Sequence, residues 1–339
     1  MMVVQVSAFC KAASAVVFLC LLSINVTSFA DEPVGTSWQA PSTFWGVPDL
    51  QGTWTNATIT GLERPVSLKT LVLPSEEATG VERWTANFYE SIDTLPEGDL
   101  QAGADVGGYN TFWMDPGRRL ARVRGEIRSS LIVDPVNGKL PYSTQGWTML
   151  TRRLLLFQNA DNPETRLLGE RCIVGFGSSG GPPMLPVLYN NFYQIVQSPG
   201  FVGILVEMNH DARIVRIGGT RLPKPIRPWM GDSVGRWDGR TLVVETTQFH
   251  RGQNLRVSLR HRIYMSPDAK VVERFTRVSS NEILYEFSVD DPATYTQTWK
   301  GEVPMLKTSD PLYEYACHEG NYSLTGILSG ARQADRDAQ

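Results

Sequence analysis

The chain of 339 residues lacks an excess of positive charge: 32 Lys and Arg stand against 35 Asp and Glu, a formal net charge of -3. No basic field is therefore available to hold the phosphate backbone of a nucleic acid. Histidine is also scarce, and none of His210, His250, His261 and His318 stands three to five positions from another. Zinc sites usually use such close spacings, so we expect no metal. We also expect no nucleic-acid partner and no other cofactor.

Long hydrophobic runs are missing beyond residue 30, where no stretch reaches the length of about 18 residues typical of a membrane span. Residues 1–30 have the order of a secretory signal: the positive Lys11, an apolar stretch through Phe18 and Leu22, and small residues at Ser28 and Ala30. An uncleaved membrane anchor is the alternative. We expect cleavage after Ala30 and a periplasmic or secreted protein without membrane contact.

Cysteine is rare, and removal of residues 1–30 leaves Cys172 and Cys317 alone. Two cysteines in an oxidising compartment indicate a disulfide, which would tie the middle of the chain to its C-terminal segment. Two buried free thiols are the alternative reading. No C-x-x-C spacing supports metal binding by this pair.

The glycine-rich run 177–181 lacks what the motifs that it resembles require. It contains a G-x-S-x-G match at Ser179, but a nucleophile elbow needs a helix directly after the serine, and the following Gly-Gly-Pro-Pro forbids one. The run also lacks the Lys-Ser/Thr of a phosphate-binding loop. We therefore assign neither a serine nucleophile nor a nucleotide site to it.

The composition, with 42% hydrophobic and 20% charged residues, is that of a globular protein. From residue 192 onward, short runs rich in β-branched and aromatic residues alternate with Gly, Pro, Asp and Asn. We expect strands at 50–56, 129–134, 193–196, 202–207, 213–217, 242–247, 255–264, 271–278, 283–289 and 296–303. Gly52-x-Trp54 in the first of them is typical of lipocalins. We predict a mainly β fold, an antiparallel lipocalin-like barrel with short helices and long N-terminal loops.

The domain organisation follows from these elements. We expect a signal peptide at 1–30, a linker at 31–48, one barrel domain at 49–333 with irregular insertions at about 57–190, and a tail at 334–339. Helical patterns are expected at 76–88, 149–160 and 317–333, and a long loop at 97–110.

The densest polar cluster spans residues 207–213, where one expected strand ends and the next begins. Glu207, His210 and Asp211 could supply an acid, a base and an orienting partner for the imidazole, and Arg213 could anchor a carboxylate. The alternative is a polar turn that faces water. We take Glu207, His210 and Asp211 as candidate catalytic residues.

A second cluster spans residues 229–240, where Asp238-Gly239 predicts a hairpin. Trp229 and Trp237 could line the mouth of a pocket, and Asp232 is a further catalytic candidate. We also expect Glu245 to form a buried pair with an arginine such as Arg274. The full set of expected substrate-binding residues is Tyr193, Arg213, Trp229, Trp237, Arg274 and Glu286.

Several of these segments carry long motifs: E-M-x-H-D-A-R at 207–213, G-D-S-x-G-R-W-x-G-x-T-L-V-V-E-T at 231–246, and C-H-E-G-N-Y at 317–322. Shorter ones stand at 110–115, 130–135 and 290–296. Together they resemble a large family of exported bacterial proteins of uncharacterised function. The resemblance implies a periplasmic, lipocalin-like β protein. Calycin-type barrels include passive carriers and cofactor-free enzymes such as phenolic acid decarboxylases, which this chain resembles in architecture only.

The sequence thus favours a cofactor-independent acid/base enzyme, a lyase or decarboxylase, that acts on a small aromatic or carboxylated compound inside the barrel. The chain has 9 Trp, 11 Tyr and 13 Phe, and aromatic walls suit aromatic ligands. Two alternatives stay open. One is a lipocalin-like carrier of a small hydrophobic ligand, and the other is a hydrolase in which Asp211 orients His210 as a base for water.

Overall fold

A computed structural model describes residues 38–93 and 114–338. The expected signal peptide, its cleavage site and the loop at 97–110 lie outside the described residues. The helices are α1 (Ser75–Asp93), α2 (Thr144–Gln158) and α3 (Tyr322–Asp337). The strands before residue 190 are β1 (Gly52–Thr55), β2 (Val72–Leu73), β3 (Arg122–Val123), β4 (Glu126–Arg128) and β5 (Ile132–Asp134). Those after it are β6 (Phe192–Ser198), β7 (Phe201–Val206), β8 (Ala212–Ile217), β9 (Asp232–Asp238), β10 (Thr241–Thr247), β11 (Leu255–Val257), β12 (Arg262–Tyr264), β13 (Lys270–Arg277), β14 (Glu282–Asp290) and β15 (Trp299–Lys307).

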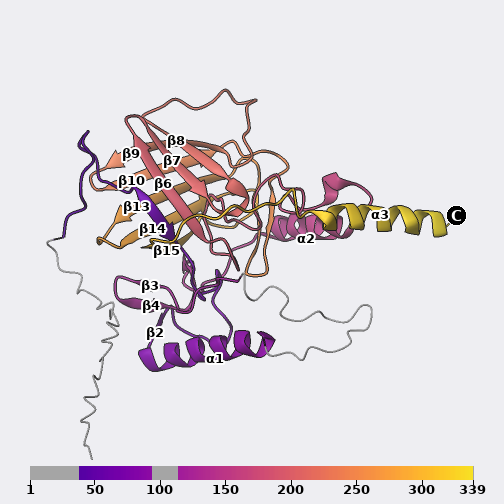
Figure 1. Ribbon diagram of the computed structural model, residues 1–339, viewed down its shortest axis with the longest axis horizontal. Helices are drawn as coiled ribbons and strands as arrows, with labels where there is room; N and C mark the ends of the chain where they lie inside the picture. The colour runs from indigo at the N-terminus through magenta and orange to yellow at the C-terminus, as the bar shows by residue number, and fades with distance from the viewer. Residues whose placement is uncertain (1–37, 94–113, 339) are drawn as a thin grey trace, which may run out of the picture. The chain divides into compact units, whose positions relative to one another are not determined.

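Nine strands of the described chain close into a barrel in the order β1-β6-β7-β8-β9-β10-β13-β14-β15, and β1 pairs with β15 to complete the ring (Figure 1). β5 adds to β15 beside β1. Strand β14 shows why these residues form strands: Ile283, Tyr285, Phe287 and Val289 are buried inside, while Glu286 and Ser288 point outward. The prediction of a mainly β barrel is confirmed.

One pair in this part of the chain departs from the expected antiparallel order, because β8 and β9 run parallel. The connection 218–231 carries the chain back to the end of the barrel where β8 began, so β9 starts beside that strand. A second difference concerns the strand expected at 255–264. It is a hairpin of β11 and β12 outside the barrel sheet, because the Ser258 N–H bonds the His261 carbonyl and turns the chain.

The helices lie close to the expected positions, and side-chain caps set the first residues of α2 and α3. α2 begins before the expected residue 149 because the Ser143 hydroxyl accepts the Gly146 N–H. α3 begins at Tyr322 and continues past residue 333, with Asn321 accepting the Leu324 N–H. Over residues 38–93 and 114–338 the helices are too short or too polar to cross a membrane.

Trp54 closes one end of the barrel. Its indole Nε1 donates to the Leu50 carbonyl at 3.0 Å, and the Arg277 guanidinium lies 5.4 Å from its ring centroid. Arg277 also donates to the Asp49 carbonyl. The hairpins β6–β7, β9–β10 and β13–β14 turn at this end. We call the opposite end, where β7 ends and β8 and β9 begin, the mouth.

A segment that we call the plug, residues 177–187, is buried along its whole length. Met184, Leu185 and Val187 belong to the same hydrophobic core as the side chains that point into the barrel. The Gly177 N–H bonds the Val257 carbonyl, the Ser178 N–H bonds His261 Nε2 at 3.0 Å, and Arg256 donates to the Pro182 carbonyl. Gly177 needs φ +61°, and a Cβ there would lie 2.7 Å from His261 Nε2. The barrel therefore encloses part of its own chain.

A small sheet of β2, β4 and β3 packs outside the barrel with α1 (Figure 1). Ion pairs join it to the outer face: Arg128 Nε lies 2.5 Å from Glu302, and Arg124 pairs with both Glu302 and Glu286. These contacts explain why Glu302 is buried although it points away from the barrel interior.

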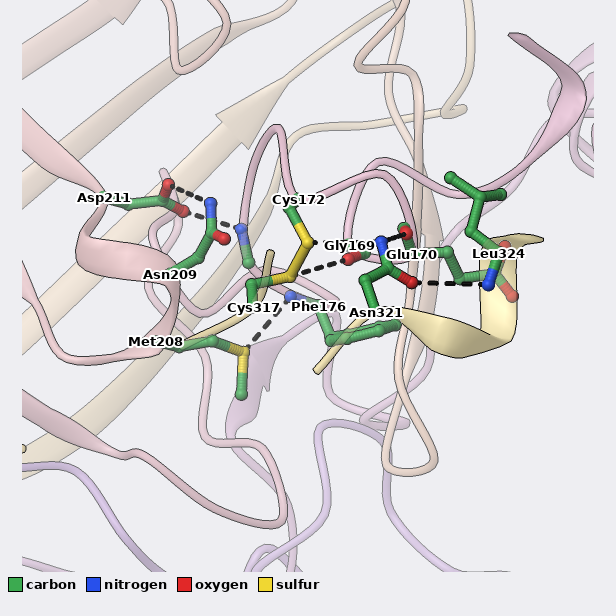
Figure 2. Close-up of a disulfide and its surroundings, with 11 residues drawn as sticks. Gly169, Glu170, Cys172, Phe176, Met208, Asn209, Asp211, Cys317, Asn321 and Leu324 are labelled. Carbon is green, nitrogen blue, oxygen red and sulfur yellow. Dashed lines mark hydrogen bonds between the residues drawn. A yellow bond between two sulfur atoms is a disulfide. The ribbon is translucent and has the colours of Figure 1, made fainter. Parts of the chain in front are cut away.

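Cys172 and Cys317 form the predicted disulfide, with their Cα atoms 5.7 Å apart. The bond joins the segment that leads into the plug to the segment before α3 (Figure 2). It spans a sequence separation of 145, so it removes many conformations from the unfolded chain.

We expect the double variant Cys172→Ser, Cys317→Ser to lose about 2–5 kcal/mol of unfolding free energy, because the unfolded chain regains this loop entropy. Urea unfolding of variant and wild type measures the loss. Two alkylatable thiols in unreduced, denatured wild type would contradict the disulfide.

Candidate functional site

Four polar side chains meet inside the barrel, and we call them the interior cluster: Tyr193, Arg213, Glu273 and Tyr285. Arg213 forms a bidentate ion pair with Glu273, with contacts of 2.9 and 2.5 Å. The Tyr285 hydroxyl donates to Glu273 at 2.8 Å. All four residues are buried, and burial raises the pKa of both tyrosines, so their hydroxyls act as neutral donors.

The interior cluster is bonded to the plug. The Tyr193 hydroxyl donates to the Ser179 carbonyl at 2.9 Å, and the Tyr285 hydroxyl accepts the Met184 N–H at 2.8 Å. Glu273 neutralises the Arg213 guanidinium, which the sequence had suggested as a carboxylate anchor. In this arrangement the cluster holds the plug, and plug and barrel side chains share the interior.

Residues 207–211, which we call the mouth turn, connect β7 to β8. Two consecutive non-glycine residues of this turn adopt left-handed backbone conformations, Asn209 with φ 60° and His210 with φ 52°. Such conformations are strained in L-residues, and they occur often at functional sites. The turn exposes the His210 side chain to solvent.

Asp211 ends the mouth turn as a buried carboxylate. It accepts the Gly175 N–H at 2.8 Å, just before the plug, and the Asn209 side-chain amide at 3.2 Å (Figure 2). Burial raises the pKa of Asp211 to about 6, partly offset by these two hydrogen bonds and by the neighbouring His210. Asp211 therefore exchanges a proton near neutral pH.

Glu207 begins the mouth turn and is also buried. Its Oε1 accepts the Tyr313 N–H at 3.1 Å, so it ties the turn to the C-terminal segment. Burial raises the pKa of Glu207, in the same direction as that of Asp211. The structure thus brings Glu207, His210 and Asp211 together in one turn, two of them with raised carboxyl pKa values.

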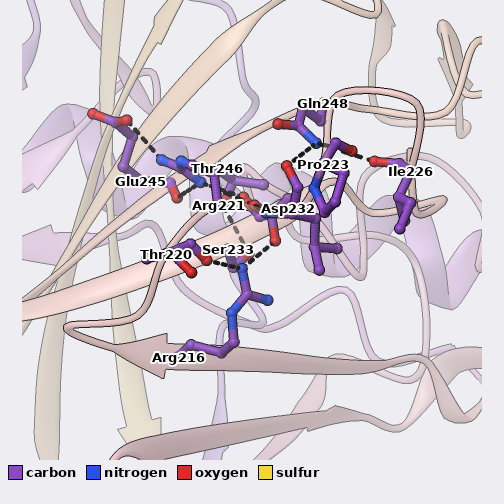
Figure 3. Close-up of polar contacts among 11 residues, drawn as sticks. Arg216, Thr220, Arg221, Pro223, Ile226, Asp232, Ser233, Glu245, Thr246 and Gln248 are labelled. Atoms are coloured by element: carbon purple, nitrogen blue, oxygen red, sulfur yellow. Dashed lines mark hydrogen bonds and ion pairs between the residues drawn. The ribbon is translucent and has the colours of Figure 1, made fainter.

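Asp232 lies on the outer face of the barrel rather than in the mouth turn. Its buried carboxylate contacts Arg216 at 2.6 Å and Arg221 at 3.8 Å, and it accepts the Leu222 N–H (Figure 3). These contacts fasten the connection 218–231 to β9. Asp232, which the sequence suggested as a catalytic residue, therefore has a structural role in holding this connection.

The other predicted binding residues are dispersed. Arg274 and Glu286 point outward and pair with Asp238 and Arg124. The expected Glu245–Arg274 pair is wrong, because Glu245 is 43% exposed and pairs with Arg221 at 2.6 Å. Side chains alternate between the two faces of a strand, and Glu245 and Arg274 both lie on the solvent side of β10 and β13. Neither is therefore in a position to form a buried pair.

The two tryptophans occupy opposite ends of β9. Trp237 is half-buried against the core near the end closed by Trp54. Trp229 precedes β9 at the mouth and packs on His250.

Sequence reasoning missed Glu273, Tyr285 and Arg256. The signal for Glu273 was its position two residues from both Val271 and Phe275, which places a charge on the buried face of β13. Arg256 is fully buried, and burial lowers its pKa to about 10. It donates to Ser178 Oγ at 2.9 Å, a contact that only the fold reveals.

Among residues 38–93 and 114–338, no group of three or more His, Cys, Asp or Glu side chains is placed to hold a metal ion. A scan against protein-family models and searches of curated proteins and solved structures found no match to this chain. The case for a site therefore rests on its geometry.

Because burial favours the protonated carboxyl of Asp211, the native state holds this proton more tightly than the unfolded chain. We expect the unfolding free energy to fall, by up to about 3 kcal/mol, as pH rises from about 4 to 6. Asp211→Asn should flatten this slope and leave the part due to Glu207, whereas the exposed control Asp268→Asn should not. Urea unfolding across this pH range measures the slope, and an unchanged slope in Asp211→Asn would contradict the assignment.

Glu273→Gln should lower the unfolding free energy by about 3–5 kcal/mol, because it leaves the buried Arg213 charge without its carboxylate. Asp268→Asn again serves as control: its side chain is 80% exposed in a pair with Arg227, and we expect a change within about 0.5 kcal/mol. Equal effects of the two variants in urea unfolding would show that the interior pair does not support the fold.

Proposed function

We propose that the protein is an exported, cofactor-independent acid/base enzyme, a lyase or decarboxylase, acting on a small aromatic or carboxylated compound at the mouth turn. The observation that carries the proposal is the strained backbone that exposes His210 next to Asp211, a carboxyl with a pKa of about 6. Asp211 exchanges a proton near neutral pH, and an imidazole is the side chain that enzymes use most often for proton transfer. Two such groups in one rigid turn suit proton transfer to and from a bound substrate.

The chemistry in this proposal is a proton transfer. In a decarboxylation, the bond between the carboxyl group and its carbon breaks, carbon dioxide leaves, and the electron pair on that carbon takes a proton. His210 supplies the proton as an imidazolium, and Asp211 stabilises that cation. Solvent then returns the proton to His210.

The plug supports placing the reaction at the mouth rather than deep in the barrel. It is buried over residues 177–187, and its hydrogen bonds engage Tyr193 and Tyr285. His210, by contrast, needs no rearrangement to meet a solute.

The proposal includes export to the periplasm or medium and kinship with the exported bacterial family whose motifs the chain resembles. The disulfide and the absence of a membrane-spanning helix from the described residues are consistent with export. One of the long motifs contains the mouth turn, and another begins at Gly231, the residue before β9 at the mouth.

One observation favours a carrier as the second candidate. Ser179 Oγ, Arg213 Nε and Asn56 Oδ1 are buried, and the described residues offer none of them a hydrogen-bond partner. All three belong to residues in or bonded to the interior cluster and plug. A ligand bound there would have to displace the plug, and it would then meet Arg213 Nε and Asn56 Oδ1.

His210→Ala should lower kcat by about 10²–10⁴-fold on the substrate found in a panel of phenolic acids, because it removes the proton carrier. The matched control is His318→Ala, which removes another exposed imidazole, near the disulfide. Mass spectrometry of the product distinguishes the two reactions. In deuterated water, a lyase places a deuteron on carbon, whereas in oxygen-labelled water a hydrolase places the labelled oxygen in the product. Wild-type turnover by His210→Ala would overturn the proposal.

A further inference from the structure

Three connections meet at the mouth because of the strand order. β8 and β9 are parallel neighbours, so both begin there, and β10 ends there because it is antiparallel to β9. The mouth turn, residues 228–231 and residues 248–253 are therefore adjacent. The Met230 Sδ and Asp211 Oδ2 atoms flank Gly180, at 2.9 and 3.0 Å from the position that a Cβ would take there.

Trp229 and His250 pack on each other in these connections. Their ring centroids lie 3.8 Å apart at an interplanar angle of 42°, and both residues are partly exposed. The Pro228 carbonyl accepts the N–H groups of both Gly231 and His250 at 3.0 Å, which fastens the two loops together. The ring pair is therefore held in place by backbone bonds before any ligand arrives.

The backbone at Gly252 lies close beneath the ring pair. A Cβ on Gly252 would lie 3.1 Å from Trp229 Cζ3 and 3.2 Å from His250 Nδ1. The Gly252 N–H donates to His250 Nδ1 at 3.1 Å, so the neutral imidazole carries its proton on Nε2. In the described part of the chain no side chain or carbonyl accepts that proton.

We propose that Trp229 and His250, which we call the shelf, bind an aromatic carboxylic acid and present it to the mouth turn. The ligand ring packs on the exposed part of the indole, and its carboxylate accepts the His250 Nε2 proton. Met230, which follows Trp229, and Asp211 both lie beside Gly180, so a ligand on the shelf lies next to the mouth turn. This inference rests on the proposed function, for which it names the substrate class.

The test compares benzoate with cyclohexanecarboxylate, which has the same acid group on a saturated ring. Isothermal titration calorimetry is run on wild type, Trp229→Leu, Trp229→Phe, His250→Gln and Trp84→Leu. The last is the matched control, because Trp84 is an exposed tryptophan on α1, where it stacks on Phe88.

We expect wild type to prefer benzoate, and Trp229→Leu to weaken benzoate binding by about 3- to 10-fold and to erase the preference. Trp229→Phe should keep the preference for benzoate. This result would show that Trp229→Leu loses the preference because its side chain has no aromatic ring. His250→Gln should weaken both acids, and Trp84→Leu should match wild type.

Equal affinity of wild type and Trp229→Leu for benzoate, or no binding of either acid by wild type, overturns the shelf. These results can be distinguished from a failure of the proposed function. If the ring preference depends on Trp229 while His210→Ala turns over like wild type, the shelf stands and the catalytic role of His210 falls. If turnover depends on His210 while Trp229→Leu binds normally, the reverse holds.

Discussion

Main chain that runs through the inside of a barrel must find a hydrogen-bond partner for its peptide groups, because water is excluded there. The plug meets this constraint with four side chains that come from two sides. Tyr193 and Tyr285 reach it from the barrel wall, His261 and Arg256 from the outer hairpin. The buried Arg213–Glu273 pair in turn orients Tyr285. A set of residues that resembles a binding pocket is thus used to bind the protein's own backbone.

Under the proposed function, this use of the interior places the chemistry with solutes at the mouth. Asp211 joins the two regions, since one carboxylate bonds both the residue at the entrance of the plug and the strained Asn209. Bonds from Glu207 to the C-terminal segment and from Asp211 to Gly175 hold the turn in its left-handed conformations and offset their strain. The disulfide fixes the chain on either side of this junction (Figure 2). The mouth turn is therefore a rigid support for an exposed imidazole, with the shelf beside it.

Local patterns predicted the features that depend on local physics. Alternation in Ile283, Tyr285, Phe287 and Val289 predicted β14, and the scarcity of cysteine predicted the disulfide. Several features that depend on residues far apart in the sequence were not predicted. The parallel β8–β9 pair depends on the path of a long connection. The run 177–181 resembles a nucleophile elbow and a phosphate-binding loop in sequence, but its glycines serve close packing inside the barrel. A buried Glu245–Arg274 pair was expected from charge alone, although alternation along the strands places both side chains on the solvent side of the sheet.

The central claim is that the plug is a fixed part of the core and that solutes meet the protein at the mouth turn. Native-state hydrogen exchange of the plug amides tests it most directly. The account predicts that the amides of Ser178 and Met184 exchange only through global unfolding, with the same free energy as the central strands β13 and β14. Exchange of these amides through a local opening of much lower free energy would contradict the account, because it would show a barrel interior that opens to ligands.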